Sequence, residues 1–67
     1  MNINNIKELG KLLKQSRKSQ GLTQADVALV SGVSIRLVVE LENGTRSVSF
    51  EKILKICSVL NLTIDIE

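Results

Sequence analysis

Histidine is absent from this 67-residue sequence, cysteine occurs once, at Cys57, and Phe50 is the only aromatic residue. One cysteine cannot form an internal disulfide, and without histidine the usual zinc-binding sets of Cys and His are excluded. The sequence also has no Cys–base pair, no Gly-rich phosphate loop and no carboxylate cluster with metal spacing, and it is too short to enclose a useful pocket. We therefore expect a protein that is not an enzyme and that uses no metal and no cofactor.

Long apolar runs are also missing, so we expect neither a membrane-spanning helix nor a secretory signal. A lone thiol is typical of the reducing cytosol, which predicts a cytoplasmic protein with no membrane partner. Hydrophobic residues make up 43% and charged residues 24% of the chain, as in globular proteins. A domain this small hides only about 60% of the surface that its unfolded chain exposes. Since disulfide and metal are excluded, a partner subunit is the remaining way to stabilise it.

Charge is distributed unevenly along the chain. The net charge is +2, but residues 1–20 carry five basic residues against one acidic residue, a balance of +4. Four of the basic residues recur at helical spacing and form one stripe, namely Lys7, Lys11, Lys14 and Lys18. Such a stripe is either a solvated helix face or a site for an acidic partner, so the charge permits a polyanion without requiring one.

Four helices are predicted from apolar residues at helical spacing and from capping residues at the helix ends. Their ranges are about 5–19, 24–31, 34–43 and 49–61. Their N-terminal caps are expected at Asn5, Thr23, Ser34 and Ser49, whose side chains can accept a hydrogen bond from the first turn. Cys57 continues the apolar face of the last helix, which favours a buried core thiol over a redox sensor.

The end of the chain changes period. Leu62, Ile64 and Ile66 alternate with polar residues, and a period of two is typical of a half-buried strand. Nothing else in the chain resembles a strand, so we expect these tails to pair as an antiparallel ribbon across a homodimer. This divides the chain into a helical domain, residues 1–61, and a dimerisation strand, residues 62–67. The alternative is a frayed or helical end.

Residues 23–44 predict two short helices joined by a tight turn that contains Gly32. This is helix-turn-helix geometry, in which the second helix enters the DNA major groove. The order Thr-Gln…Ala…Gly-Val-Ser…Glu-Asn-Gly resembles the lambda repressor/Cro-type helix-turn-helix family, also called the XRE family, over about residues 6–61. The resemblance implies an all-α fold, a compact bundle of four to five helices, and a DNA-binding domain in residues 1–61 of a sequence-specific regulator.

The tail and the overall length are similar to those of HipB-type antitoxins. Members of that group pair a C-terminal strand across the dimer, bind their own operator and neutralise a HipA-type kinase toxin. The resemblance therefore implies an autoregulating antitoxin of a HipA/HipB-type pair, with a HipA-like kinase as its partner.

Two opposite charges occupy helix faces that are otherwise apolar. Arg17 lies four residues beyond Leu13 in the first helix, and Glu42 lies four residues beyond Val38 in the third. Because charges on apolar faces are rarely left unpaired, we expect a partly buried ion pair between Arg17 and Glu42. The family has such a pair at the matching positions. The alternative is two unrelated surface charges.

The resemblance also assigns DNA contacts. It implies that Gln24 and Ser34 hold phosphate, and that Ser34 caps the third helix as well. Ile35, Arg36, Val39 and Glu40 occupy positions that face base edges in relatives. Arg36 would bond guanine, Ile35 would contact a thymine methyl and Glu40 would accept from cytosine N4. The backbone contacts that follow the recognition helix are expected from Thr45, Arg46 and Ser47.

One departure from the family pattern keeps a second function open. Ile35, Leu37 and Val39 make the expected recognition helix unusually apolar, so it can also pack on protein. The main expectation is a homodimeric repressor on a palindromic operator of double-stranded DNA, with half-sites about one helical turn apart. The alternative is a protein-interaction module, an antitoxin or adaptor that keeps the helix-turn-helix shape without reading bases.

Overall fold

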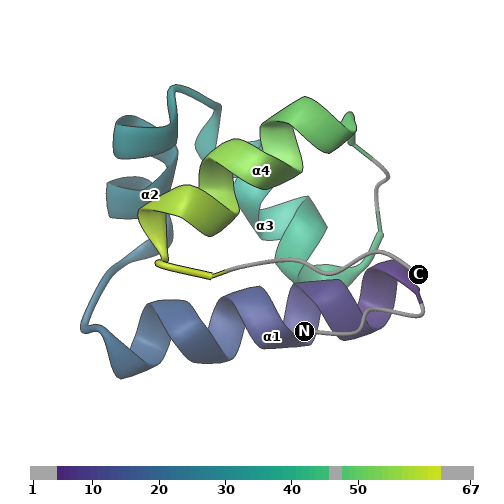
Figure 1. Ribbon diagram of the computed structural model, residues 1–67, viewed down its shortest axis with the longest axis horizontal. Coiled ribbons are helices and arrows are strands. Elements are labelled where there is room, and N and C mark those ends of the chain that lie inside the picture. Colours follow the sequence, from purple (N-terminus) through teal and green to yellow (C-terminus); the bar gives the residue numbers. More distant parts are fainter. Residues whose placement is uncertain (1–4, 46–47, 63–67) are drawn as a thin grey trace.

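The computed structural model describes residues 5–45 and 48–62, and within these ranges the chain forms four α-helices and no strand (Figure 1). None of these helices is long and apolar enough to cross a membrane. The four predicted helices are confirmed within two residues at each end. They are α1 (Ile6–Ser19), α2 (Gln24–Ser31), α3 (Ile35–Asn43) and α4 (Phe50–Val59).

Side-chain caps begin all four helices. Asn5 Oδ1 accepts a hydrogen bond from the backbone N–H of Glu8 at 2.9 Å. At α2 the cap is reciprocal, because Thr23 Oγ1 accepts from the Asp26 N–H at 3.0 Å and Asp26 Oδ2 accepts from the Thr23 N–H at 2.9 Å. The hydrogen bonds from Thr23 lower the pKa of the Asp26 carboxyl below its usual range. A cap of this kind typically contributes about 1 kcal/mol, so each helix start is specified locally.

All four helices also end in the same way, with a residue in the left-handed region followed by a backbone bond back into the last turn. Asn61 has φ 58°, and the Leu62 N–H donates to the Cys57 carbonyl at 2.8 Å. This is the Schellman motif, which satisfies carbonyls that a helix end otherwise leaves unpaired. The left-handed positions at the other three helix ends are Gly21, Gly32 and Gly44.

The core lies where α1 and α2 pack against α3, and α4 packs against α2. In Figure 1, α1 runs along the lower edge, α2 stands at the side and α3 lies behind α4. The most deeply buried side chains come from all four helices and are Leu13, Val27, Val38, Leu41, Ile56, Cys57 and Leu60. Cys57 is buried in this core, and the burial raises the pKa of its thiol.

The predicted fold class is wrong in its C-terminal strand and in its allowance for a fifth helix, because the described residues form four helices and no strand. Leu62, the first residue of the predicted strand, completes the cap of α4 and packs half-buried against the core of its own chain. Its apolar character is therefore explained by the helix end rather than by a pleated face. Residues 63–67, with Ile64 and Ile66, lie outside the described residues.

Candidate nucleic-acid interface

The turn between α2 and α3 consists of residues 32–34. Gly32 caps α2 at φ 72° and ψ 30°, a conformation that an L side chain rarely adopts. The Val33 N–H donates to the Ala28 carbonyl at 3.0 Å, and the Val33 side chain packs against the core. Ser34 then starts α3 by accepting a hydrogen bond from the Leu37 N–H at 3.1 Å. The two helices thus form a fixed helix-turn-helix unit.

The third helix has one buried and one outward face. Leu37 is only 4% exposed and belongs to the core, as do Val38 and Leu41. Ile35 is 53% exposed, whereas Val39 is half-buried. Of the three apolar residues that favoured a protein partner, Ile35, Leu37 and Val39, only Ile35 is therefore exposed to solvent. None of the four predicted base-reading residues is buried in the core. They form the outward face of α3, which consists of Ile35, Arg36, Val39 and Glu40.

Two of these residues are bonded to each other. Arg36 Nε donates to Glu40 Oε1 at 3.0 Å, across one helical turn. The Arg36 side chain is 86% exposed and that of Glu40 is 28% exposed. The structure therefore joins an arginine and a carboxylate that the sequence assigned to two separate base contacts.

The residues after α3 are only partly within the described chain. Thr45 is exposed, and its hydroxyl donates to the Glu40 carbonyl at 3.2 Å, close to the end of the helix. Its backbone N–H donates to the same carbonyl at 3.0 Å. Thr45 is thus held against the C-terminus of α3. The other two predicted backbone contacts, Arg46 and Ser47, lie outside the described residues.

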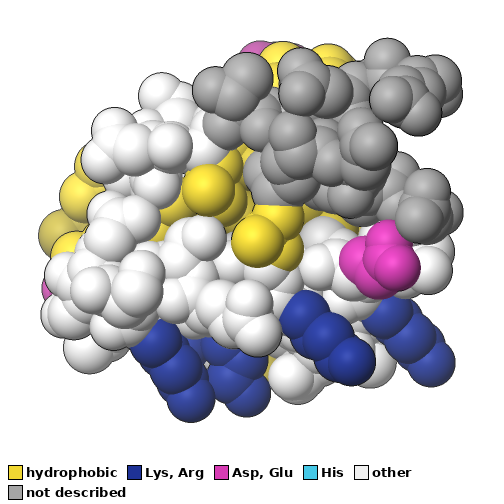
Figure 2. Space-filling model, turned by 60° about the horizontal axis from the view of Figure 1, so that its bottom comes forward, with side chains coloured by type: hydrophobic (Ala, Val, Ile, Leu, Met, Phe, Trp, Pro, Cys, Tyr) yellow, Lys and Arg dark blue, Asp and Glu magenta, His cyan; other side chains and the backbone are white. Residues whose placement is uncertain are grey.

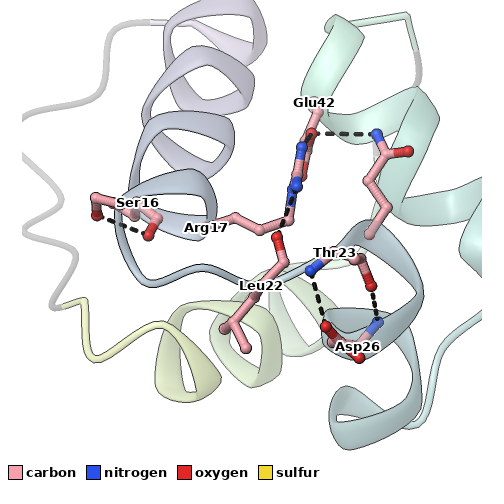
Figure 3. A network of polar contacts seen from close by, with 8 residues as sticks. Ser16, Arg17, Leu22, Thr23, Asp26 and Glu42 are labelled. Carbon is pink, nitrogen blue, oxygen red and sulfur yellow. Dashed lines mark hydrogen bonds and ion pairs between the residues drawn. The ribbon is translucent and has the colours of Figure 1, made fainter.

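A buried polar network connects α1 to the helix-turn-helix unit (Figure 3). Arg17 Nε and Nη2 donate to Glu42 Oε2 and Oε1 at 2.7 and 3.0 Å, a bidentate pair whose side chains are 10% and 3% exposed. Arg17 Nη1 donates to the Leu22 carbonyl at 2.8 Å, in the segment that leads into α2. The hydrogen bond from Arg17 to Glu42 raises the pKa of the guanidinium, against the desolvation that lowers it.

Gln24 completes this network. Its side-chain amide donates to Glu42 Oε1 at 3.2 Å, so the first residue of α2 is joined to the last turn of α3. One carboxylate thereby accepts hydrogen bonds from two helices. The side chain that the sequence assigned to phosphate is held in place by the same residue that pairs with Arg17.

Comparison with known proteins identifies the fold family, since a helix-turn-helix family profile matches residues 13–66. The chain belongs to the helix-turn-helix family. This confirms the likeness to the lambda repressor/Cro-type proteins at the level of the family.

Two known proteins are similar to this chain in sequence. An uncharacterized HTH-type transcriptional regulator, y4mF of Sinorhizobium fredii, is 37% identical over 59 residues, which cover 88% of this chain and 78% of the relative. The antitoxin PezA of Streptococcus pneumoniae is 42% identical over 55 residues. That match covers 82% of this chain but only 35% of PezA.

A solved helix-turn-helix structure matches over most of its length. The restriction-modification controller protein C.AhdI of Aeromonas hydrophila has a TM-score of 0.82 and 33% sequence identity, over 87% of this chain and 88% of the controller protein. At this identity and coverage the likeness extends beyond a shared topology to the arrangement of the whole helix-turn-helix domain.

Sequence reasoning missed one residue that positions α3 in this helix-turn-helix protein. Gly10 lies in the middle of α1, directly against the backbone of α3. A Cβ atom at this position would meet the Leu41 carbonyl oxygen and would lie 2.6 Å from the Glu42 carbonyl oxygen. A glycine inside an otherwise regular helix was the signal, because it costs helix stability unless a close approach requires it.

The lysine stripe of α1 projects away from the core (Figure 2). Lys7, Lys11, Lys14 and Lys18 are all exposed, and Figure 2 shows basic side chains along the lower edge of this view. Within the described ranges none of them forms an ion pair with another residue. The stripe is a basic face on α1, a different helix from the one whose outward face carries the predicted base contacts.

Proposed function

We propose that this protein is a sequence-specific DNA-binding transcriptional regulator that inserts α3 into the major groove. The observation that carries this proposal is the outward face of α3, which presents Ile35 and Arg36 beside the turn while its opposite face is fixed in the core. In helix-turn-helix proteins the N-terminal residues of the second helix contact base edges. Membership of the helix-turn-helix family supports the same function.

The surrounding residues fit a phosphate clamp. Gln24 is the first residue of α2, where backbone N–H groups have no partner within the helix and the helix dipole favours an anion. Ser34 is exposed at the start of α3 and gives a second such position. These contacts would set the register of the protein on DNA, while Arg36 would supply base preference.

The proposal is a binding function and not an enzymatic one. The polar side chains on the outward face of α3 suit hydrogen bonding to bases and phosphates.

A finer proposal is that the protein represses its own promoter as a homodimer on a palindromic operator. The likeness to an HTH-type transcriptional regulator supports a regulatory role. The likeness to the antitoxin PezA, over about a third of that protein, supports an antitoxin role. The resemblance to HipB-type antitoxins adds a HipA-like kinase as the candidate partner.

One observation favours a second candidate function, a protein-interaction module. Leu29 and Val30, near the end of α2, are 82% and 70% exposed, and Ile35 follows across the turn at 53%. Exposed apolar side chains of this size are common at protein–protein contacts. An antitoxin or adaptor that had lost base reading would use such residues.

Nuclease footprinting on the DNA upstream of the coding sequence tests the proposal. The assay uses the full chain at near-physiological salt with competitor DNA, because non-specific binding depends strongly on salt. We expect a protected palindrome with half-sites about one helical turn apart. Arg36→Ala should protect the same DNA only at a higher protein concentration, whereas Lys11→Ala removes the same charge from α1 and should protect it as the wild type does. Absence of protection by a folded wild-type protein would favour the interaction module.

A further inference from the structure

The hydrogen bond between Arg36 and Glu40 indicates that these two residues of the outward face of α3 have different roles in binding. We propose that Glu40 is a positioning residue that orients Arg36 toward a guanine, rather than a reader of cytosine. The inference rests on the proposed DNA-binding function and adds the base class that the site selects and the residue that sets this selection.

The geometry of the guanidinium carries the argument. Arg36 donates its Nε–H to Glu40 Oε1 at 3.0 Å, and this bond leaves the two terminal Nη groups available for other acceptors. The guanidinium is planar, so a hydrogen bond at Nε restricts the orientations that both terminal nitrogens can adopt. The two Nη groups then form a fork at the end of a side chain that is 86% exposed. Guanine presents two acceptors, O6 and N7, in the major groove, and this fork matches them.

The position of Arg36 along α3 fits the same role. It is the second residue of α3, two residues after the cap at Ser34, and the N-terminal residues of a recognition helix are the part that reaches the base edges. A side chain of this length is flexible in water and would lose many rotamers on binding. The Glu40 carboxylate, one turn further along α3, restricts the rotamers of Arg36 before DNA binds. This preorganisation lowers the entropic cost of binding.

Helix stability does not explain the pair. In i,i+4 pairs the acidic residue stabilises a helix more when it precedes the basic one, and here the arginine comes first. Arg36 also lies in the first turn, where the helix dipole disfavours a positive charge. The order of charges is therefore the less favourable one for α3. With the arginine before the glutamate, the pair instead holds the guanidinium near the N-terminus of α3.

Glu40 is poorly placed to read a base by itself. Its side chain is only 28% exposed, and its Oε1 already accepts from Arg36. A carboxylate brought close to DNA is repelled by the phosphates unless a cation accompanies it, and Arg36 is that cation. Entry into the groove removes water around the pair, which strengthens the attraction between the two charges. Binding thus tightens the bond that orients the guanidinium.

A double-mutant cycle on DNA discrimination tests the inference. The variants are Arg36→Ala, Glu40→Ala and the double variant, with Glu51→Ala as the matched control. Glu51 is likewise the carboxylate of an i,i+4 pair, with Lys55 on α4, and it lies far from the outward face of α3 in sequence. The measured quantity is the ratio of affinities for a duplex that the wild type selects and for the same duplex with the relevant G·C pair replaced. A ratio is insensitive to the fraction of folded protein, and circular dichroism checks the helix content of each variant.

We expect Arg36→Ala to reduce the ratio about 5- to 150-fold, the range for one bidentate base contact. Glu40→Ala should reduce the ratio at the same base pair by at least about 3-fold, and should have no further effect once Arg36 is absent. Glu40→Gln keeps an acceptor and should retain part of the discrimination, and Glu51→Ala should leave the ratio unchanged.

Two results would overturn the inference while leaving the proposed function intact. One is an effect of Glu40→Ala that adds independently to that of Arg36→Ala. The other is a loss of preference at a different base pair, which is the result expected of a cytosine reader. A wild-type protein that discriminates among no duplexes would instead contradict the proposed function itself.

Discussion

Replacement of Gly10 by alanine should destabilise this protein, although the same change in most helices is stabilising. Gly10 lies inside α1, where alanine is ordinarily more favourable than glycine by about 1 kcal/mol. The added Cβ would meet the Leu41 carbonyl oxygen and lie 2.6 Å from the Glu42 carbonyl oxygen and 2.9 Å from its carbon. These are backbone atoms of α3, which cannot rotate away. The backbones of α1 and α3 must therefore shift apart at this point.

The size of the effect follows from overpacking, which typically costs about 1–3 kcal/mol in a well-packed core. Because the clash is with backbone atoms, the upper part of this range applies, about 2–3 kcal/mol. After the gain of about 1 kcal/mol in helix propensity is subtracted, Gly10→Ala should lower the free energy of unfolding by about 1–2 kcal/mol. Urea denaturation followed by circular dichroism measures the change. Lys11→Ala alters the neighbouring exposed position and should stay within about 0.5 kcal/mol of the wild type. A Gly10→Ala protein as stable as the wild type would refute the close approach of the two helices.

Three further predictions concern buried or hydrogen-bonded charges and the thiol. Glu42→Ala leaves the Arg17 guanidinium buried without its carboxylate and should lower the free energy of unfolding by about 3–5 kcal/mol in urea denaturation; a loss under about 1 kcal/mol would contradict a buried pair. The pKa of Asp26 is lowered in the folded state, so its stabilising contribution is present above the unfolded pKa and is lost as the pH falls below about 4. Melting temperatures between pH 6 and pH 2 should therefore fall more steeply for the wild type than for Asp26→Asn, and parallel curves would be evidence against the capping bond. Burial raises the pKa of Cys57, so a thiol reagent at neutral pH should modify this residue only in urea; rapid modification of the native protein would show that the thiol is accessible.

The helices could be predicted from the sequence because their ends are specified locally. Ser34 and Thr23 accept hydrogen bonds from the turn that follows them, and Gly32 and Gly44 supply the left-handed residue that ends a helix. These interactions span only a few residues, so their signals can be read without knowledge of the tertiary structure. The pairing of Arg17 with Glu42 spans 25 residues, yet it could be expected because each charge lies on an apolar helix face.

The features that sequence reasoning missed depend on contacts between elements or on competition between local motifs. Gly10 is explained only by the backbone of α3, which no local pattern reveals. The alternation that begins at Leu62 predicted a strand, but the left-handed Asn61 before it places Leu62 in a helix cap. Arg36 and Glu40 have i,i+4 spacing, and the spacing alone indicated a pair; assigning each to its own base concealed that signal.

The central claim is that α3 reads DNA bases and that Arg36 is a principal reader. The most direct test is to sequence the duplexes that the wild-type protein and Arg36→Ala retain from the same randomised pool at near-physiological salt. We predict that the wild type enriches one motif with a fixed guanine, and that Arg36→Ala enriches the same motif without that guanine. No enriched motif for the folded wild type, or an identical motif for both proteins, would contradict the claim.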